Sequence, residues 1–527
     1  MKAPKWLKKA VFYEIYPQSF YDSNNDGIGD IKGIIRKLPY VWELGCNAIW
    51  LNPCFMSPFQ DAGYDISDFY KVAPRYGTNA DLEELFRQAK KRGIRIIFDL
   101  VPGHTSTEHP WFKASCSAEK NPYSGRYIWT NSVWEDAGPG MSTISGYAER
   151  DGKYITNFFH FQPALNYGFG SPDPSKPWQV STMHPDAVKT KEELKKVIRF
   201  WLDMGASGFR VDMAFSLVKN DNDQKKTITF WKEIRSMLDR EYPDAVMVSE
   251  WGSPVKSLSA GFHMDFTLHI CDCMEMYLPL FRKGKQSFFH ENGAGNIKQF
   301  VEKYTQWYSR TKNMGYISFV TGNHDMVRIS HKKDKRTLKP IFAFILSMPG
   351  VPFIYYGDEI GMKYQPKLVS REGGYERTGS RTPMQWDNSR NAGFSLAPQG
   401  KLYLPTEKGK SATSVGSQRK NPGSLLNTVR KLIQARSEHS ALQADGDFRA
   451  LYAKEKKYPF VYLRSLGNEK IIVAVNPCAM SKEASFPAKK IKKLSLILQD
   501  NIISAEIKNR VVSIRMKGFS FGFWKIC

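Results

Sequence analysis

Acidic, basic and imidazole side chains recur where short apolar runs of the sequence end. Each alone is typical of a helix cap or of a buried polar residue, but carboxylates that converge with an arginine can act as nucleophile and proton donor in group transfer. The side chains are Asp99 and His104 in "RIIFDLVPGH", Arg210 and Asp212 in "GFRVDMA", Glu250 in "AVMVSEW", and His324 and Asp325 in "YISFVTGNHD". Such chemistry requires a fold that brings these four runs to one place.

Eight apolar runs predict strands, and the amphipathic stretches between them predict helices. Strands that alternate with helices form a parallel sheet, and eight such units close into an α/β fold, the (β/α)₈ TIM barrel. Catalytic residues of such barrels lie at the carboxyl ends of the strands, where the polar side chains above are found. The predicted strands are 11–20, 48–53, 95–104, 208–214, 245–251, 264–269, 316–325 and the run from Pro352 onward.

Two of the connecting segments show clear helical patterns. The stretch "NADLEELFRQAKKRGI" has helical periodicity. The stretch "TKEELKKVIRFWLDMGAS" is predicted to begin with a capping box from Thr190 to Glu193 and to end near Gly205.

The composition changes twice along the chain and divides it into domains. Residues 105–167 are rich in Gly, Pro, Ser and aromatic residues and are too long for an ordinary loop, which predicts an inserted subdomain (domain B) after the third strand. Alternating runs such as "FVYLRSL" and "KIIVAVN" predict a C-terminal antiparallel β-sandwich (domain C) over 445–527. The barrel (domain A) is then formed by 1–104 and 168–444.

The length, composition and charge of the chain limit the classes of protein to which it can belong. It has 527 residues, a hydrophobic share of 42% and a formal net charge of +24. No apolar run approaches the roughly 20 residues that span a bilayer, so no membrane partner is expected. The lysines alternate with polar and apolar residues, which favours a solvated basic surface over a nucleic-acid partner. The N-terminal stretch has no leader-like apolar segment, and the seven scattered cysteines indicate no disulfide framework, so we expect a cytoplasmic protein. The sequence leaves the oligomeric state undecided.

The segments "DLVPGH", "GFRVDMAFS", "VSEWG" and "FVTGNHD" resemble the four signature regions of the alpha-amylase superfamily, glycoside hydrolase family 13. The resemblance implies that Asp212 is the nucleophile, Glu250 the general acid/base and Asp325 the carboxylate that supports the transition state. It also implies that His104, Arg210 and His324 contact substrate. Retaining glycosidases with such a pair of carboxyls form a covalent glycosyl-enzyme.

Two further motifs resemble one branch of that superfamily. "GYDISDFY" and "RTPMQWD" are similar to α-glucosidases and oligo-1,6-glucosidases, which implies that Tyr64, Asp65 and Arg381 lie around a terminal glucose. The expected activity is therefore that of a retaining, exo-acting α-glucosidase, whose partner is a small oligosaccharide or disaccharide substrate.

Other activities stay open at this level. The longer stretch "RTPMQWDNSRNAGFS" also resembles trehalose synthase, a transglucosidase or isomerase that uses the same intermediate. A non-catalytic sugar-binding or transporter-associated homologue is disfavoured because all three carboxylates are present. The sequence leaves linkage, chain length and aglycone undecided.

The stretch "FYDSNNDGIGD" predicts a structural metal site. Asp22, Asn24, Asp26, the Ile28 carbonyl and Asp30 form a ring of oxygens suited to Ca²⁺ or Mg²⁺. The stretch resembles the metal-binding loop after the first barrel strand of oligo-1,6-glucosidases. Its alternative is a metal-free turn held by Asx hydrogen bonds.

The calcium site that alpha-amylases hold between barrel and insertion is expected to be missing. Gly103, Ala164 and the Phe215-Ser216 pair stand where those enzymes carry oxygen or imidazole ligands. No organic cofactor is expected.

Overall fold

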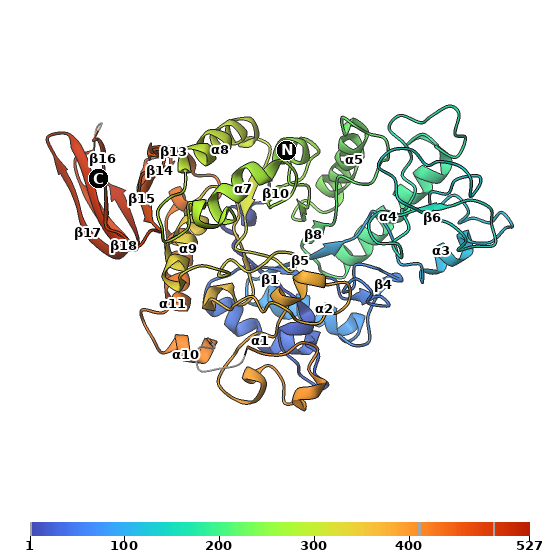
Figure 1. The fold of residues 1–527 in the computed structure, drawn as a ribbon, viewed down its shortest axis with the longest axis horizontal. Coiled ribbons are helices and arrows are strands. Elements are labelled where there is room, and N and C mark those ends of the chain that lie inside the picture. The colour runs from blue at the N-terminus through green and yellow to red at the C-terminus, as the bar shows by residue number, and fades with distance from the viewer. Residues whose placement is uncertain (1–2, 408–412, 489–490) are drawn as a thin grey trace.

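A closed barrel of eight parallel strands forms the centre of the molecule (Figure 1). The computed structural model describes residues 3–407, 413–488 and 491–527. Strand β1 pairs with β2 and β12, and a bridge from Val320 to Phe353 joins the two ends of the sheet. This confirms the predicted TIM barrel. The strands are β1 (Phe12–Ile15), β2 (Ala48–Leu51), β5 (Arg95–Leu100), β8 (Gly208–Val211), β9 (Val246–Ser249), β10 (Met264–Thr267), β11 (Tyr316–Phe319) and β12 (Phe353–Tyr355).

Helices surround this barrel and bury their apolar faces against it. Every residue of helix α9 except Lys339 is buried, because the helix contacts both α11 and the C-terminal strands β15 and β18. The helices are α1 (Ile31–Leu44), α2 (Asn79–Lys91), α4 (Pro185–Asp203), α5 (Lys225–Glu241), α6 (Pro254–Ser259), α7 (Met274–Phe281), α8 (Ile297–Thr311), α9 (Leu338–Ser347), α10 (Val415–Arg419) and α11 (Leu425–Glu438).

The start of helix α4 differs from the prediction. The helix begins at Pro185, and His184 Nδ1 caps it by accepting a hydrogen bond from Asp186 N at 3.3 Å. Thr190 lies inside the helix and donates its hydroxyl to Asp186 O at 2.9 Å. The predicted capping box at Thr190 was therefore wrong, because a proline at the first helical position and a histidine cap start the helix earlier.

The segment between β5 and α4 lies at one end of the molecule, on the right in Figure 1. It holds α3 (Pro110–Ser115) and the short paired strands β6 (Thr143–Ile144) and β7 (Tyr154–Ile155). Phe112 stacks on Trp129 and meets Tyr154 edge-on, which gives the segment an aromatic core. A second short pair, β3 (Phe55–Met56) and β4 (Asp68–Val72), follows β2. The boundaries 105–167 stay a prediction.

Six antiparallel strands form the C-terminal region, on the left in Figure 1. Side chains alternate along β14: Phe460 and Tyr462 face the main core, whereas Val461 and Leu463 enter a second apolar cluster. The sheet curls so that β13 contacts β16 around that cluster. The strands are β13 (Asp447–Tyr452), β14 (Phe460–Leu466), β15 (Glu469–Asn476), β16 (Lys482–Pro487), β17 (Leu494–Lys508) and β18 (Val511–Ile526). No helix within the described ranges is long and apolar enough to cross a membrane.

Candidate active site

One arginine joins three carboxylates at the carboxyl ends of neighbouring strands. Arg210 on β8 lies 2.5 Å from Asp99 on β5, 2.8 Å from Asp212 and 2.7 Å from Glu250, which follows β9. Glu250 also accepts a hydrogen bond from Met213 N at 3.1 Å. The barrel register therefore brings together side chains that are up to 151 positions apart in the sequence (Asp99 and Glu250).

The charges of this cluster do not balance. Three ionised carboxylates around one guanidinium leave two net negative charges, so a buried cluster favours retaining a proton. Burial raises the pKa of Asp212 well above its usual value; Arg210 opposes this, and Glu250 and Asp99 add to it. Burial likewise raises the pKa of Asp99 against the effect of Arg210. The cluster can thus hold one proton for transfer and still present a carboxylate.

A second cluster of charged side chains follows β11, beside the Arg210 cluster. His324 Nε2 lies 3.1 Å from Asp325 Oδ2 and 2.7 Å from the Tyr64 hydroxyl, whose ring stacks on the imidazole. Arg381 contacts Asp325 Oδ1 at 2.8 Å and donates to His324 O at 2.9 Å. Although burial opposes ionisation of Asp325, His324, Arg377 and Arg381 hold its pKa well below the usual value. Asp325 is therefore a stable anion in the site.

A carboxylate that the sequence analysis missed reaches this group. Asp61 accepts from Gln162 Nε2 at 2.8 Å and lies 3.5 Å from Arg377, which itself contacts Asp325 at 2.8 Å. Burial raises the pKa of Asp61 to about 6. Arg377 thus links Asp61 to Asp325. Both were within reach of sequence reasoning, because Asp61 precedes "GYDISDFY" by two positions and Arg377 precedes Arg381 by four.

Asp65, which the sequence predicts to lie near a sugar, is hydrogen-bonded within its own loop and outside the cluster. Its oxygens accept hydrogen bonds from Ser57 Oγ at 2.9 Å, Gln60 N at 2.8 Å and Asp61 N at 3.1 Å. The carboxylate therefore stabilises the loop that carries Asp61 and Tyr64. Tyr64 reaches His324 while the adjacent Asp65 bonds to its own loop, a division that sequence spacing alone does not reveal.

The inserted segment reaches the site through Asn157. This residue lies 3.2 Å from His104 Nδ1 and accepts from Lys219 Nζ at 2.8 Å. Lys219 also donates to Ser216 O at 2.7 Å, in the turn after Asp212. Burial lowers the pKa of Lys219 to about 8 and that of His104 to about 3, so the histidine is neutral. An ammonium group thus joins insertion and barrel close to Gly103 and Ser216.

Aromatic side chains border the site. Residues 157–162 begin at Asn157, beside His104, and end at Gln162, beside Asp61. Between them, Phe159 stacks on Phe161 and lies 6.0 Å, centroid to centroid, from Tyr375. Side chains of Asp325 and Glu250 keep 25% and 13% of their surface exposed, so solvent reaches both carboxylates.

The loop after β1 is held by its own carboxylates. Asp22 accepts from the amides of Asn24, Asn25 and Gly27 and from Ser395 Oγ at 2.6 Å. Asp30 accepts from Ser23 and from Gly33 N, which caps α1. Over the described ranges, no group of three acidic, His or Cys side chains is placed to hold a metal. The Ca²⁺ or Mg²⁺ site stays a prediction.

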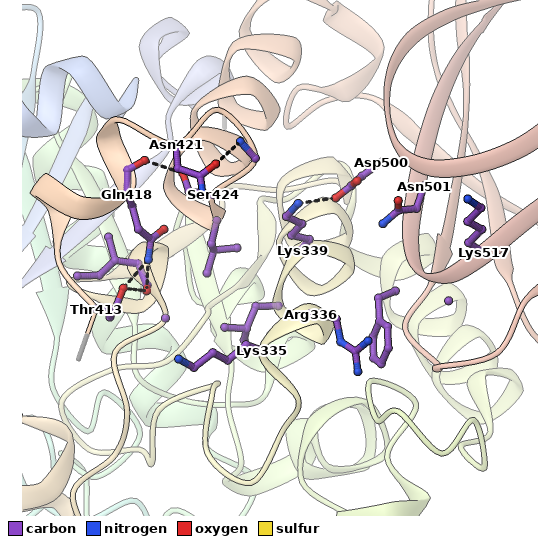
Figure 2. A pocket seen from close by; sticks show the side chains of 17 residues that line it. Lys335, Arg336, Lys339, Thr413, Gln418, Asn421, Ser424, Asp500, Asn501 and Lys517 are labelled. Carbon is purple, nitrogen blue, oxygen red and sulfur yellow. Dashed lines mark hydrogen bonds and ion pairs between the residues drawn. The ribbon is translucent and has the colours of Figure 1, made fainter. Parts of the chain in front are cut away.

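A cavity of about 540 Å³ lies elsewhere, at the junction of the barrel with the C-terminal sheet (Figure 2). Lys335, Arg336 and Lys339 at the start of α9 line it from one side, and Asp500 and Lys517 from the other. Lys339 lies 2.7 Å from Asp500. None of the catalytic candidates lines this cavity, so we do not assign the chemistry to it.

Comparison with known proteins places these observations in a family. The family described as "Alpha amylase, catalytic domain" matches residues 14–445. The trehalose synthase/amylase TreS of Mycolicibacterium smegmatis is 34% identical over 494 residues, covering 85% of this chain and 78% of that protein. The oligo-1,6-glucosidase of Parageobacillus thermoglucosidasius is 30% identical over 582 residues, covering 99% of both chains.

Solved structures give the same picture. A mutant of the trehalulose synthase MutB in complex with Tris has a TM-score of 0.80 and 27% identity, covering 99% of this chain and 100% of the other. A MutB mutant in complex with its substrate sucrose has a TM-score of 0.81 and 26% identity over the full length of both chains. TreS and MutB are thus named as synthases of trehalose and of trehalulose, respectively.

Proposed function

The chain belongs to the alpha-amylase family, as an α-glucosidase-like enzyme, and from this premise we propose that it transfers the terminal glucosyl unit of a short α-glucoside with retention of configuration. We further propose that the acceptor is mainly the released sugar, so that the enzyme isomerises disaccharides as a trehalose synthase does. Hydrolysis by exo-action, the leading expectation from sequence, becomes the second candidate.

In the first step, Asp212 acts as the nucleophile. Its carboxylate oxygen forms a bond to the anomeric carbon while the bond from that carbon to the glycosidic oxygen breaks. Glu250 gives its proton to the departing oxygen, which leaves a covalent glucosyl-enzyme and an ionised Glu250. Arg210 contacts both carboxylates. This arrangement favours the separation of about 5–5.5 Å between the two carboxyl groups that retaining enzymes use, and not the wider separation of inverting enzymes.

In the second step, a sugar hydroxyl attacks the same carbon. Glu250 takes the proton of this hydroxyl, the new glycosidic bond forms, and Asp212 leaves as a carboxylate. Asp325, kept ionised by His324 and two arginines, accepts hydrogen bonds from the donor sugar and supports positive charge at the anomeric carbon. Tyr64, His104 and Arg381 complete the donor-sugar pocket.

The observation that carries exo-action is the contact of Arg377 with both Asp325 and Asp61. This bridge closes the pocket beyond the donor sugar, so that only a chain end fits. Gly373 supports it, because a side chain at this position, with φ +62°, would meet Gln60 O at 2.6 Å from its Cβ. The segment bearing Arg377 can therefore lie directly on the loop of Asp61.

Transfer to a sugar is supported by the aromatic border and by the names of the similar proteins. Phe159 from the inserted segment and Tyr375 from the Arg377 segment lie with their ring centroids 6.0 Å apart. Aromatic rings hold the apolar face of a sugar and limit the access of water. A leaving sugar retained there is placed to attack the intermediate before water does.

Product analysis tests the proposal. The protein is incubated with maltose, trehalose, sucrose and isomaltose, and proton NMR follows free glucose and new disaccharide. We expect one of the four to give mainly an isomeric α-disaccharide. Free glucose as the main product from every substrate would support the hydrolase, and an initial β-anomer would refute the assigned roles of Asp212 and Glu250.

For the loop after β1 we propose a structural Ca²⁺ held by Asp22, Asn24, Asp26, the Ile28 carbonyl and Asp30. Both oxygens of Asp26 and Oδ2 of Asp30 accept one hydrogen bond each and keep a further lone pair for a cation, whereas each Asp22 oxygen already accepts two hydrogen bonds. Asp22 N also donates to Phe394 O at 3.0 Å, so the ion would stabilise the segment that follows Arg381. Melting in excess Ca²⁺ and in chelator should then differ by a few degrees. Identical melting curves would favour the metal-free turn.

A further inference from the structure

A carboxylate lies behind the active site in a position that the proposed reaction does not use. Glu14 is on β1, fully buried, and its side chain enters the barrel. Oε1 lies 2.9 Å from His324 Nδ1 and 3.3 Å from His324 N. The other oxygen, Oε2, has no hydrogen-bond partner among the described residues. Burying a carboxylate that lacks a hydrogen bond on one oxygen costs folding free energy unless the hydrogen bonds to its other oxygen are strong.

His324 is therefore clamped between two carboxylates. Its Nδ1 faces Glu14 at 2.9 Å and its Nε2 faces Asp325 at 3.1 Å. Carboxylates only accept hydrogen bonds, so both contacts are satisfied only when both ring nitrogens carry protons. Turning the Asn52 amide places its nitrogen 3.3 Å from Glu14 Oε1 and its oxygen 3.1 Å from His324 Nδ1, which also requires a proton on Nδ1. The geometry is that of an imidazolium.

The electrostatics agree with this geometry. Burial opposes a charge on His324, but Asp325 and Glu14 raise the pKa of His324 to about 9. Burial raises the pKa of Glu14 to about 7, and the hydrogen bond from His324 limits that rise. The other titratable or charged groups near the pair are Tyr16, Tyr64, Asp99, Tyr355, Arg377 and Arg381.

We propose that Glu14 is a positioning residue that keeps His324 doubly protonated and directed at Asp325. This deepens the proposed function and rests on it for the role of Asp325. Through His324, Glu14 sets the orientation of the carboxylate that receives the donor sugar, without touching the sugar itself. It also extends the pH range over which His324 and Asp325 remain an ion pair.

The test is Glu14→Gln in the full-length protein, which keeps the size of the side chain and removes its charge. The ring signals of histidine, labelled with ¹³C, are followed from pH 5 to 10, and His324→Gln assigns the resonance. We expect His324 to titrate at least one pH unit lower in Glu14→Gln. The pH at which kcat/KM declines on the alkaline side should shift down by the same amount. Near pH 8.5 the kcat/KM of the variant should therefore be lower than that of the parent by on the order of tenfold, because a shift of one pKa unit changes a protonation equilibrium tenfold. Near pH 6, where His324 should be protonated in both proteins, the two profiles should converge.

Glu359→Gln is the matched control. Glu359 is equally buried, its pKa is also raised by burial to about 7, and it accepts from Tyr13 and Tyr40 away from His324. Its substitution should leave the His324 titration unchanged. Parallel pH profiles and the same His324 titration in Glu14→Gln and the parent would overturn the proposal.

The parent protein alone supplies a second criterion. If Glu14→Gln does not fold, a parent His324 that titrates near 6.5 would still refute the proposal, whereas one near 9 supports it. The titration also separates this proposal from the proposed function. If the protein transfers no glucosyl unit but shows the shifted His324 titration, the proposed function is contradicted and the role of Glu14 is not.

Discussion

The catalytic end of the barrel and the junction cavity of Figure 2 both gather charged side chains, but they neutralise them differently. At the catalytic end, buried Arg210 contacts three carboxylates, and Asp325 contacts a histidine and two arginines. At the junction, exposed Lys335 and Lys517 make no ion pair with any described residue, whereas Lys339 pairs with Asp500 and Arg336 pairs with Asp334.

The difference shows where electrostatic energy can serve chemistry. Charges in a buried network interact strongly and shift one another's pKa values, whereas exposed charges are screened by water and salt. The formal charge of +24 therefore says little about the reaction, and the few buried charges say most. Changes at the two regions should differ greatly in effect.

The largest effect is expected from Asp212→Asn. Without a nucleophile no glucosyl-enzyme forms, and kcat should fall on the order of 10⁴-fold or more. Steady-state transfer from an aryl α-glucoside measures it, and a melting curve close to that of the parent controls for folding. Activity within tenfold of the parent would show that another group attacks the anomeric carbon.

A pair of neighbouring aspartates gives the next comparison. Asp61→Asn should lower kcat/KM roughly 10- to 100-fold, equivalent to about 1.5–3 kcal/mol for a hydrogen bond to a charged group. Asp65→Asn should instead lower the melting temperature by some degrees and change kcat/KM little, because its oxygens contact only its own loop. The reverse result would show that Asp65, and not the bridge between Asp61 and Arg377, serves the donor-sugar pocket.

Lys219 tests a buried cation beside the site. Its folded pKa of about 8 lies below the ordinary 10.5, so the unfolded chain binds more protons between these values. The free energy of unfolding should therefore rise relative to Lys219→Met as pH increases from 8 to 10.5, and this advantage is lost as pH falls to 8. We expect about 1 kcal/mol or more, since one pKa unit equals about 1.36 kcal/mol. Urea unfolding measures it, with exposed Lys226→Met on α5 as the control; equal slopes would contradict the shift.

The smallest effect is expected at the junction. The double variant Lys335→Gln, Lys517→Gln should keep kcat/KM within about twofold, because exposed charges are largely screened beyond the Debye length of about 10 Å. It should elute earlier from a cation-exchange column. A loss of activity above tenfold would show instead that the junction cavity communicates with the catalytic end.

The barrel could be predicted from the sequence because eight apolar runs end in polar residues. Strands and the helices that follow them are specified by local patterns of apolar and polar residues. Sequence reasoning placed Asp212, Glu250 and Asp325 at strand ends for the same reason. It failed at Thr190, where a proline and a histidine start the helix earlier, and it did not select Asp61, which the structure places beside Arg377. Both points concern local geometry that no periodicity encodes.

By itself, then, the sequence determined the order of strands and helices, the identity of the carboxylates and their membership of one face of the barrel. Only the tertiary structure decided which charges meet. The contacts of Arg210 with Asp99 and Glu250, of Arg377 with Asp61, and of Glu14 with His324 join side chains far apart in the chain. They depend on barrel closure and loop conformation, because electrostatic partners are set by distance and burial and not by position in the sequence.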